Sequence, residues 1–167
     1  MAQQRFMRRG ITRILWLKTV ADPGKIPSRA ELSSPNATDL TEAVSDVDGW
    51  SLTNEAIETP DMASTFSSSI PGNDKADNSS ITFYEDQVSD AIETLLSKGA
   101  VGFVVFLRKG DIPGSKSMDV FPAQVASRAA QYNAGNEAAK FQAVFSITSP
   151  PALDAAVPAA TTTKAGS

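Results

Sequence analysis

The groups whose type and spacing could perform chemistry are a turn containing glycine, lysine and serine and a run of closely spaced carboxylates. The turn, residues 110–117, follows an apolar run and contains the residue types of a phosphate-binding loop. Ser115 separates Gly114 from Lys116, so the spacing does not match a loop whose backbone N–H groups wrap phosphates. Pro113 also removes one N–H donor. We therefore interpret residues 110–117 as a tight surface turn.

The run of carboxylates offers pairs of the kind used in acid–base catalysis. It comprises Glu85, Asp86, Asp90 and Glu93. On a helix these residues would also form the solvated face opposite an apolar stripe, and we favour this interpretation because the sequence indicates no cleft around them. A carboxylate-based hydrolase, which needs a deep cleft with two acidic groups of different pKa, stays an alternative. We expect a protein that is not an enzyme.

The absence of cysteine and histidine narrows the chemistry further. It excludes disulfides, zinc–thiolate sites, iron–sulfur clusters, thiol nucleophiles and the Ser-His-Asp arrangement. Residues 46–49, Asp-Val-Asp-Gly, are similar to the start of a calcium loop but lack the later ligands and the closing glutamate. We therefore predict no cofactor and no metal ion.

The charge balance is unfavourable for binding nucleic acid. With 15 basic and 19 acidic residues the formal net charge is −4, whereas phosphate neutralisation needs a basic surface. Arginines at positions 5, 8, 9 and 13 form a small basic cluster that could meet an acidic neighbour, although solvated arginines are the commoner arrangement. The longest apolar run, residues 100–107, is far shorter than the roughly 20 residues of a membrane-spanning helix. We expect neither a membrane segment nor a signal peptide.

Several segments that would position these groups have the periodicity of strands. Residues 10–19 have apolar side chains on both faces, which indicates a strand covered on both sides. Residues 100–109 are typical of a buried strand, and residues 136–148 alternate, with Phe141 and Phe145 on one face. Weaker strand patterns occupy residues 47–59, 61–71, 79–84 and 119–132, the last of which could also be a weak helix.

One segment has the period of a helix. In residues 85–98, Val88, Ile92, Leu95 and Leu96 form an apolar stripe. Acidic residues lie in its early turns, and Gly99 is a suitable terminator. We predict one helix over about residues 85–98.

Two segments lack any period. Residues 20–41 are rich in proline and serine and predict a long loop. Residues 151–167 are rich in alanine, threonine and proline, and we predict a disordered tail. The fold class is therefore mainly β (α+β), a β-sandwich or partly open barrel with one flanking helix, in a single domain over residues 1–150.

In the order of its sequence segments, the chain resembles the major tail protein, or tail tube protein, of long-tailed bacteriophages with non-contractile tails, especially those of actinobacteria. The resemblance covers about residues 5–150. It rests on the following series: DGWS (48–51), IETPD (57–61), SITFYED (80–86), KGAVGFVV (98–105), GDIPG (110–114), DVFP (119–122) and FQAVFSIT (141–148).

The resemblance implies a structural virion protein of tail tube fold. It implies hexameric rings that stack into a tube for DNA delivery, assembled in the host cytoplasm with tip, tape measure and terminator proteins. Strands with apolar side chains on both faces also favour self-association, because burying both faces needs more packing surface than one domain supplies. Because phosphates adhere to cationic surfaces, we predict a bore with net negative charge, which DNA passes without specific binding.

The long loop provides the candidate contact residues. Asp22, Lys25, Arg29 and Glu31 suit an arm that reaches a neighbouring subunit or ring and becomes ordered on contact. Two alternatives stay open. One is the inner tube protein of a contractile tail or a type VI-like injection machine, and the other is a monomeric β-sandwich that binds a peptide or sugar.

Overall fold

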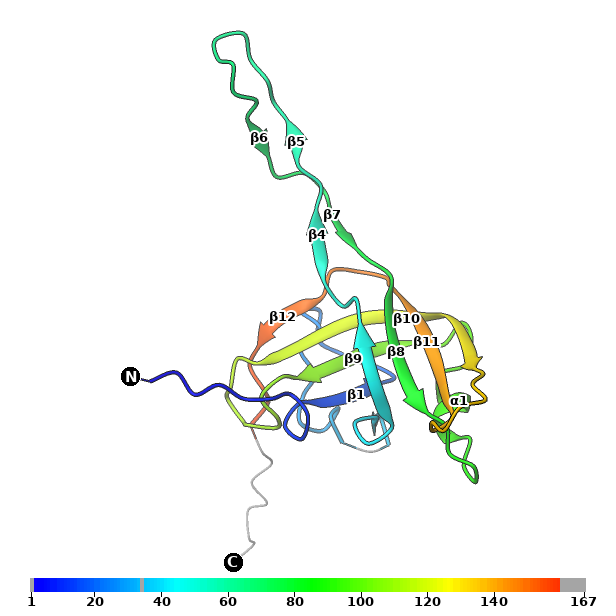
Figure 1. Ribbon diagram of the computed structural model, residues 1–167. Helices are drawn as coiled ribbons and strands as arrows, with labels where there is room; N and C mark the ends of the chain where they lie inside the picture. The colour runs from blue at the N-terminus through cyan, green and yellow to red at the C-terminus, as the bar shows by residue number, and fades with distance from the viewer. Residues whose placement is uncertain (1, 34, 160–167) are drawn as a thin grey trace, which may run out of the picture.

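The computed structural model describes residues 2–33 and 35–159, and its centre is an antiparallel sheet of eight strands (Figure 1). The strands follow the order β2-β1-β9-β10-β11-β8-β3, and β12 pairs with β10. They are β1 (Arg13–Leu17), β2 (Ala37–Asp39), β3 (Val44–Asp48), β8 (Ser79–Tyr84), β9 (Val101–Leu107), β10 (Met118–Gln131), β11 (Lys140–Ile147) and β12 (Ala152–Ala155). The mainly β fold class predicted from the sequence is confirmed.

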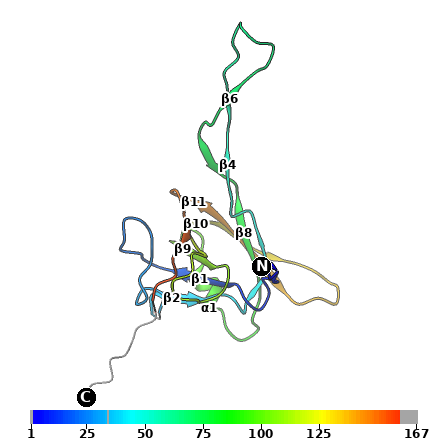
Figure 2. The same cartoon turned by 90° about the vertical axis from the view of Figure 1, so that its left-hand side faces the viewer.

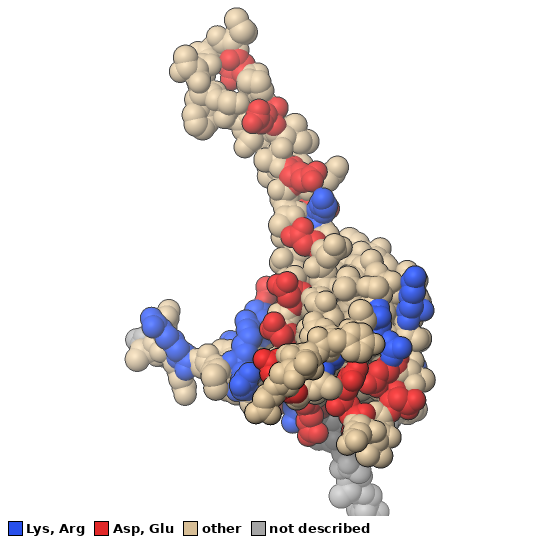
Figure 3. Space-filling model, turned by 45° about the vertical axis from the view of Figure 1, so that its right-hand side comes forward, with Lys and Arg blue, Asp and Glu red and all other residues tan. Residues whose placement is uncertain are grey.

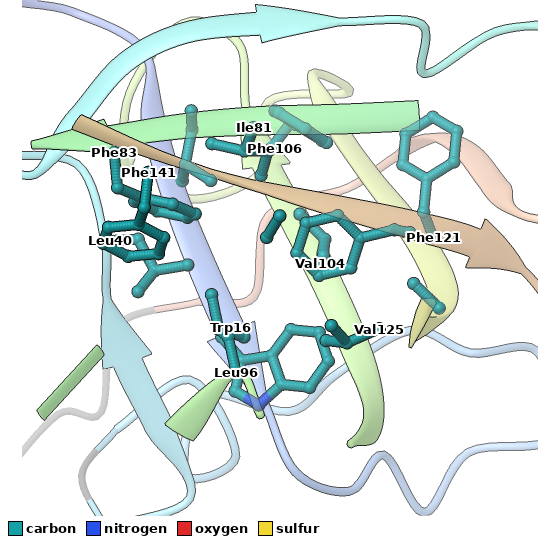
Figure 4. Packing of buried hydrophobic residues seen from close by; sticks show 14 residues of the cluster. Trp16, Leu40, Ile81, Phe83, Leu96, Val104, Phe106, Phe121, Val125 and Phe141 are labelled. Carbon is teal, nitrogen blue, oxygen red and sulfur yellow. The ribbon is translucent and has the colours of Figure 1, made fainter. Parts of the chain in front are cut away.

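One face of the sheet encloses an aromatic core (Figure 4). Alternation along β11 directs Phe141, Ala143 and Phe145 inward, as predicted. Phe145 packs against Trp16 of β1, with ring centroids 6.0 Å apart, and Phe141 stacks on Phe83 of β8. The core therefore joins strands that are far apart in the sequence.

The opposite face is also apolar and is covered by the chain itself. Its buried side chains are Leu15, Leu17, Val105, Leu107, Met118 and Val120. Leu32 of the long loop and Ala155 and Val157 of the C-terminal segment pack against them. The two-sided strands predicted from the sequence are thus correct, but the expectation that their second face needs another copy is wrong.

Two segment boundaries differ from those predicted. Residues 37–39 of the proposed 20–41 loop form β2, which pairs with β1, and Leu40 is completely buried. Residues 152–155 of the proposed disordered tail form β12, where Ala155 pairs with Met118. Backbone pairing and burial order this alanine-rich segment, although it has little to bury by itself. Residues 160–167 of the proposed tail lie outside the described residues.

The single helix is shorter than the predicted one. Helix α1 spans Ala91–Leu95, and Val88 is 96% exposed rather than part of an apolar stripe. The Asp86 carboxylate accepts hydrogen bonds from the N–H groups of Val88 and Ser89, at 2.8 and 3.2 Å. These bonds stabilise a local turn that precedes the helix. Leu96, just after the helix, is fully buried in the core.

A long hairpin projects from the body and is the most prominent feature of the shape (Figures 1 and 2). It comprises two short pairs, β4 (Leu52–Asn54) with β7 (Asp74–Ala76) and β5 (Ile57–Glu58) with β6 (Ser69–Ile70). We call residues 51–78 the arm. The sequence predicted strands here but not their projection.

Candidate assembly surfaces

The root of the arm is fixed in the core by Trp50. Its ring lies 5.2 Å from that of Phe106, 5.3 Å from Phe121 and 5.4 Å from Phe145, measured between centroids. The indole N–H donates to the carbonyl of Ser80 at 3.1 Å, and the backbone N–H donates to Ser79 Oγ at 3.1 Å. Aromatic packing with a satisfied indole N–H makes this a firm attachment.

The shaft of the arm is held by side chains as well as by its backbone. Asn54 Nδ2 donates to the carbonyl of Gly72 at 2.9 Å, and the N–H of Gly72 donates back to Asn54 Oδ1 at 3.0 Å. A Cβ on Gly72 would lie 2.1 Å from the carbonyl oxygen of Glu55, so only glycine permits this approach. Residues 71–73 therefore form an irregularity in the shaft between β6 and β7.

The tip of the arm exposes large apolar side chains. Met62 is fully exposed and Phe66 is 75% exposed, while Ile57 and Ile70 of the shaft are more than half exposed. A two-stranded hairpin by itself is marginally stable in water, and exposed apolar side chains on such an element mark a contact surface.

The arm is also acidic. It contains five acidic residues and one lysine: Glu55, Glu58, Asp61, Asp74, Asp77 and Lys75. Figure 3 shows the acidic side chains distributed along its length. The arm thus combines an apolar tip with a negatively charged shaft.

A groove of about 540 Å³ lies on the body, and residues of the N-terminal segment, β1, β3, β9 and β10 contribute to its lining. We call it the groove between β1 and β3. Its lining combines aromatic and aliphatic side chains with charged and hydroxyl-bearing ones. The lining residues are Arg8, Arg9, Gly10, Thr12, Ile14, Thr41, Val44, Ser45, Asp46, Val47, Trp50, Phe106, Arg108, Asp119 and Phe121. Arg108 is paired with Asp119 at 3.1 Å, which neutralises one acidic residue of the rim.

The N-terminal segment forms one wall of this groove. The carbonyl of Arg8 accepts hydrogen bonds from the N–H groups of Ile11 and Thr12, at 3.0 and 2.8 Å. The Thr12 hydroxyl then donates to the carbonyl of Arg108 at 2.8 Å. These bonds hold Arg8 and Arg9 beside the groove.

The four contact residues predicted from the sequence lie in the loop between β1 and β2, and two of them tie it to the C-terminal part of the chain. Arg29 forms a two-point ion pair with Asp111, at 2.8 and 2.9 Å, and donates to the carbonyl of Pro158 at 2.6 Å. The Lys25 ammonium donates to the carbonyl of Pro150. Arg29 holds the pKa of Asp111 below its ordinary value, and Asp111 raises that of Arg29.

The two acidic residues of the set stabilise turns within the loop. Asp22 Oδ2 accepts from the N–H of Ile26 at 3.2 Å. Glu31 accepts from the N–H groups of Ala21 and Ser28, at 2.9 and 3.2 Å. Burial raises the pKa of Glu31, but these hydrogen bonds outweigh burial and leave that pKa lowered. All four residues thus order the loop on its own body, and their contact with a neighbour stays a prediction.

The carboxylates near α1 do not assemble into a catalytic pair. Glu85, Asp86 and Glu93 surround a hollow with Asp39 and Glu42. The hydrogen bonds from Val88 and Ser89 lower the pKa of Asp86, which keeps it ionised at neutral pH. Within residues 2–33 and 35–159, no three His, Cys, Asp or Glu side chains are grouped so as to hold a metal ion. No helix in this part of the chain is long and apolar enough to cross a membrane.

The architecture is that of known tail and tube-associated proteins. A chain of the anti-feeding prophage baseplate matches with a TM-score of 0.59 and 12% identity, covering 89% of this chain and 95% of that one. A chain of the anti-feeding prophage tube-terminating cap has a TM-score of 0.55 and 13% identity, covering 87% and 89%. A tail chain of an empty gene transfer agent particle has a TM-score of 0.54 and 9% identity, covering 90% and 98%.

The family follows from the sequence match. The chain belongs to the phage tail tube protein family, whose model matches residues 1–160. It is therefore a structural component of the virion tail and not an enzyme. No curated protein matches the chain significantly.

Proposed function

We propose that six copies of this chain form a ring and that rings stack into the tube of a non-contractile tail, through which DNA passes to an actinobacterial host. The family supports a tube-forming role. The structures with similar folds are described as 6-fold symmetrised for the anti-feeding prophage baseplate and as having C6 symmetry for the gene transfer agent tail. Assembly takes place in the host cytoplasm, and tip, tape measure and terminator proteins are the other partners.

The observation that carries the proposal is the arm. It extends away from a body whose own two apolar faces are already covered, and it exposes Met62 and Phe66 at its tip. Such an element costs conformational entropy without adding to the core, so it serves contacts with other molecules. Copies linked through arms would be joined along one direction.

A free sheet edge supports contacts within a ring. The pairing of β10 with β9 ends at Gln124, and residues 127–131 pair with β11 alone. Unpaired strand edges invite pairing with another chain. We propose that neighbouring subunits cover this edge. Asp22, Lys25, Arg29 and Glu31 remain secondary candidates for contact between subunits or rings, and the acidic bore remains part of the proposal.

Electron microscopy of the purified chain, alone and with its tail-tip proteins, tests this function. We expect hollow tubes with sixfold end views and without a sheath. Mass spectrometry of purified virions should find the chain as an abundant tail component. A chain that stays monomeric under every condition and is absent from virions would contradict the proposal, and sheathed particles would assign it to a contractile tail.

A further inference from the structure

The groove between β1 and β3 has the chemistry to receive an apolar segment flanked by negative charge. Trp50 supplies aromatic surface and packs on Phe106 and Phe121, which are themselves only 9% and 3% exposed. Val44 and Val47 add aliphatic surface. A volume of about 540 Å³ falls within the ordinary range of binding pockets, roughly 300–1,000 Å³, so it can hold more than one large side chain. Aromatic pockets of this kind bind apolar anchors at protein interfaces.

Two arginines at the rim have no partner within the described part of the chain. Arg8 and Arg9 form no ion pair there, whereas Arg13, Arg29 and Arg108 all do. Both arginines lie on a segment, residues 2–13, that contains four arginines and no acidic residue. This side of the groove is therefore positively charged and available to carboxylates.

The arm has the complementary features. Phe66 and Met62 supply exposed apolar side chains at the tip, and Glu58 and Asp61 lie close to them in the sequence. The arm cannot enter the groove of its own body, because it points away from that body (Figures 1 and 2). At about 3.3 Å per residue its length of some 14 residues per side reaches up to about 45 Å, far enough to contact a second body.

Resting on the proposed function, we infer that the arm tip of one copy docks in the groove between β1 and β3 of the next copy. Phe66 and Met62 contact Trp50 and the valines of β3, and Glu58 and Asp61 face Arg8 and Arg9. The two surfaces differ, so each copy offers one tip and one groove, and the contact can repeat from copy to copy. A repeating contact of this kind extends into a filament when the rotation between copies does not close a ring.

Cysteine cross-linking tests the contact directly, because the chain has no cysteine of its own. Thr65→Cys places a thiol at the exposed tip, and Ser45→Cys places one on the groove wall. The two single variants are mixed, oxidised and separated on a non-reducing gel, in both the assembled and the soluble fractions. The control pairs Thr65→Cys with Ser97→Cys on the exposed turn after α1, outside the groove and the free edge of β10.

The expected result is a disulfide-linked heterodimer for the pair at positions 65 and 45, at least tenfold more abundant than for the control pair. Tubes that form without this cross-link would overturn the docking contact and leave the proposed function standing. A cross-link without tubes would support docking and contradict the proposed function. Absence of both tubes and cross-link would contradict both.

Charge reversal provides a second test that does not depend on thiol geometry. Arg8→Glu with Arg9→Glu should weaken assembly at least tenfold, as should Glu58→Lys with Asp61→Lys, whereas the combination of all four should restore it. Lys98→Glu, on the exposed turn after α1 and outside the groove, the arm and the free edge of β10, is the matched control. Failure of the combined variant to recover, when each parent is impaired and folded, would contradict the pairing.

Discussion

Arg29 and Asp111, which are 82 residues apart in the sequence, are joined by two parallel hydrogen bonds of 2.8 and 2.9 Å. The same guanidinium donates to the carbonyls of Pro158 and Ala159, at 2.6 and 3.3 Å. A single side chain thus connects the β1–β2 loop, the turn after β9 and the C-terminal segment. The β1–β2 loop and the C-terminal segment cover the second apolar face of the sheet.

Replacing Arg29 with alanine should loosen this cover. We expect a loss of about 1–2 kcal/mol in the free energy of unfolding, because a two-point ion pair and two carbonyl contacts disappear together. Limited proteolysis should cut the loop between β1 and β2 faster than in the parent. The matched control is Arg13→Ala, which removes a more exposed, single-contact pair with Asp39. Equal effects of the two changes would contradict this role for Arg29.

The pKa of Asp111, lowered by Arg29, predicts a dependence of stability on pH. The folded state favours the ionised carboxylate, so the pair contributes fully above the ordinary aspartate pKa of about 3.9. Its contribution is lost as the pH falls from there through the lower pKa of the folded state. Chemical unfolding at a series of pH values should show a smaller decline below about pH 4 for Asp111→Asn than for the parent. Parallel curves would contradict the prediction.

At Gly102, strand β9 lies very close to strand β1. A Cβ there would lie 2.5 Å from the Trp16 ring and 2.6 Å from the carbonyl oxygen of Leu17. Because the backbone of β1 would have to move, Gly102→Ala should cost about 1–3 kcal/mol in thermal or chemical unfolding. Val101→Ala, at an exposed neighbouring position, should cost much less. A stability unchanged by the Gly102 substitution would mean that β1 and β9 are not packed as described.

Shortening the arm should separate assembly from folding. Joining Asn54 to Asp74, which are paired in β4 and β7, through an Asn-Gly turn removes the tip and keeps the root. The melting temperature should change little because the removed residues are almost all exposed. Electron microscopy should show no tubes. Tubes formed by this folded variant would exclude the arm as the element that links copies.

The sequence predicted best the elements whose burial repeats regularly along the strand. The alternation around Phe141 and Phe145 and the apolar run around Val104 indicated strands that the structure confirms. A hydrophobic periodicity of this kind shows whether one face or both faces of a strand are buried. It can be recognised from neighbouring residues in the sequence alone.

The features that the sequence did not predict depend on longer-range contacts or on side-chain bonds. Helix α1 begins only at Ala91, and in the segment before it the Asp86 carboxylate holds the N–H groups of Val88 and Ser89 in a separate local turn. Strand β12 forms only by pairing with Met118 and Val120, more than 30 residues earlier. The arm has no buried face, so its strands show no alternation of apolar and polar residues. The sequence therefore provided no indication that this hairpin projects from the body. The groove joins residues from four segments of the chain, and the basic cluster around Arg8 was its one visible sign in the sequence.

The attachment of the arm at Trp50 has a mechanical consequence. Because the indole lies among three phenylalanine rings and the arm continues covalently into β3 and β8, tension on the arm passes directly into the aromatic core. In a filament linked through arm tips, a lengthwise load would therefore reach the body of each subunit at this tryptophan. Each link between copies would be anchored in the folded core and not in a surface loop.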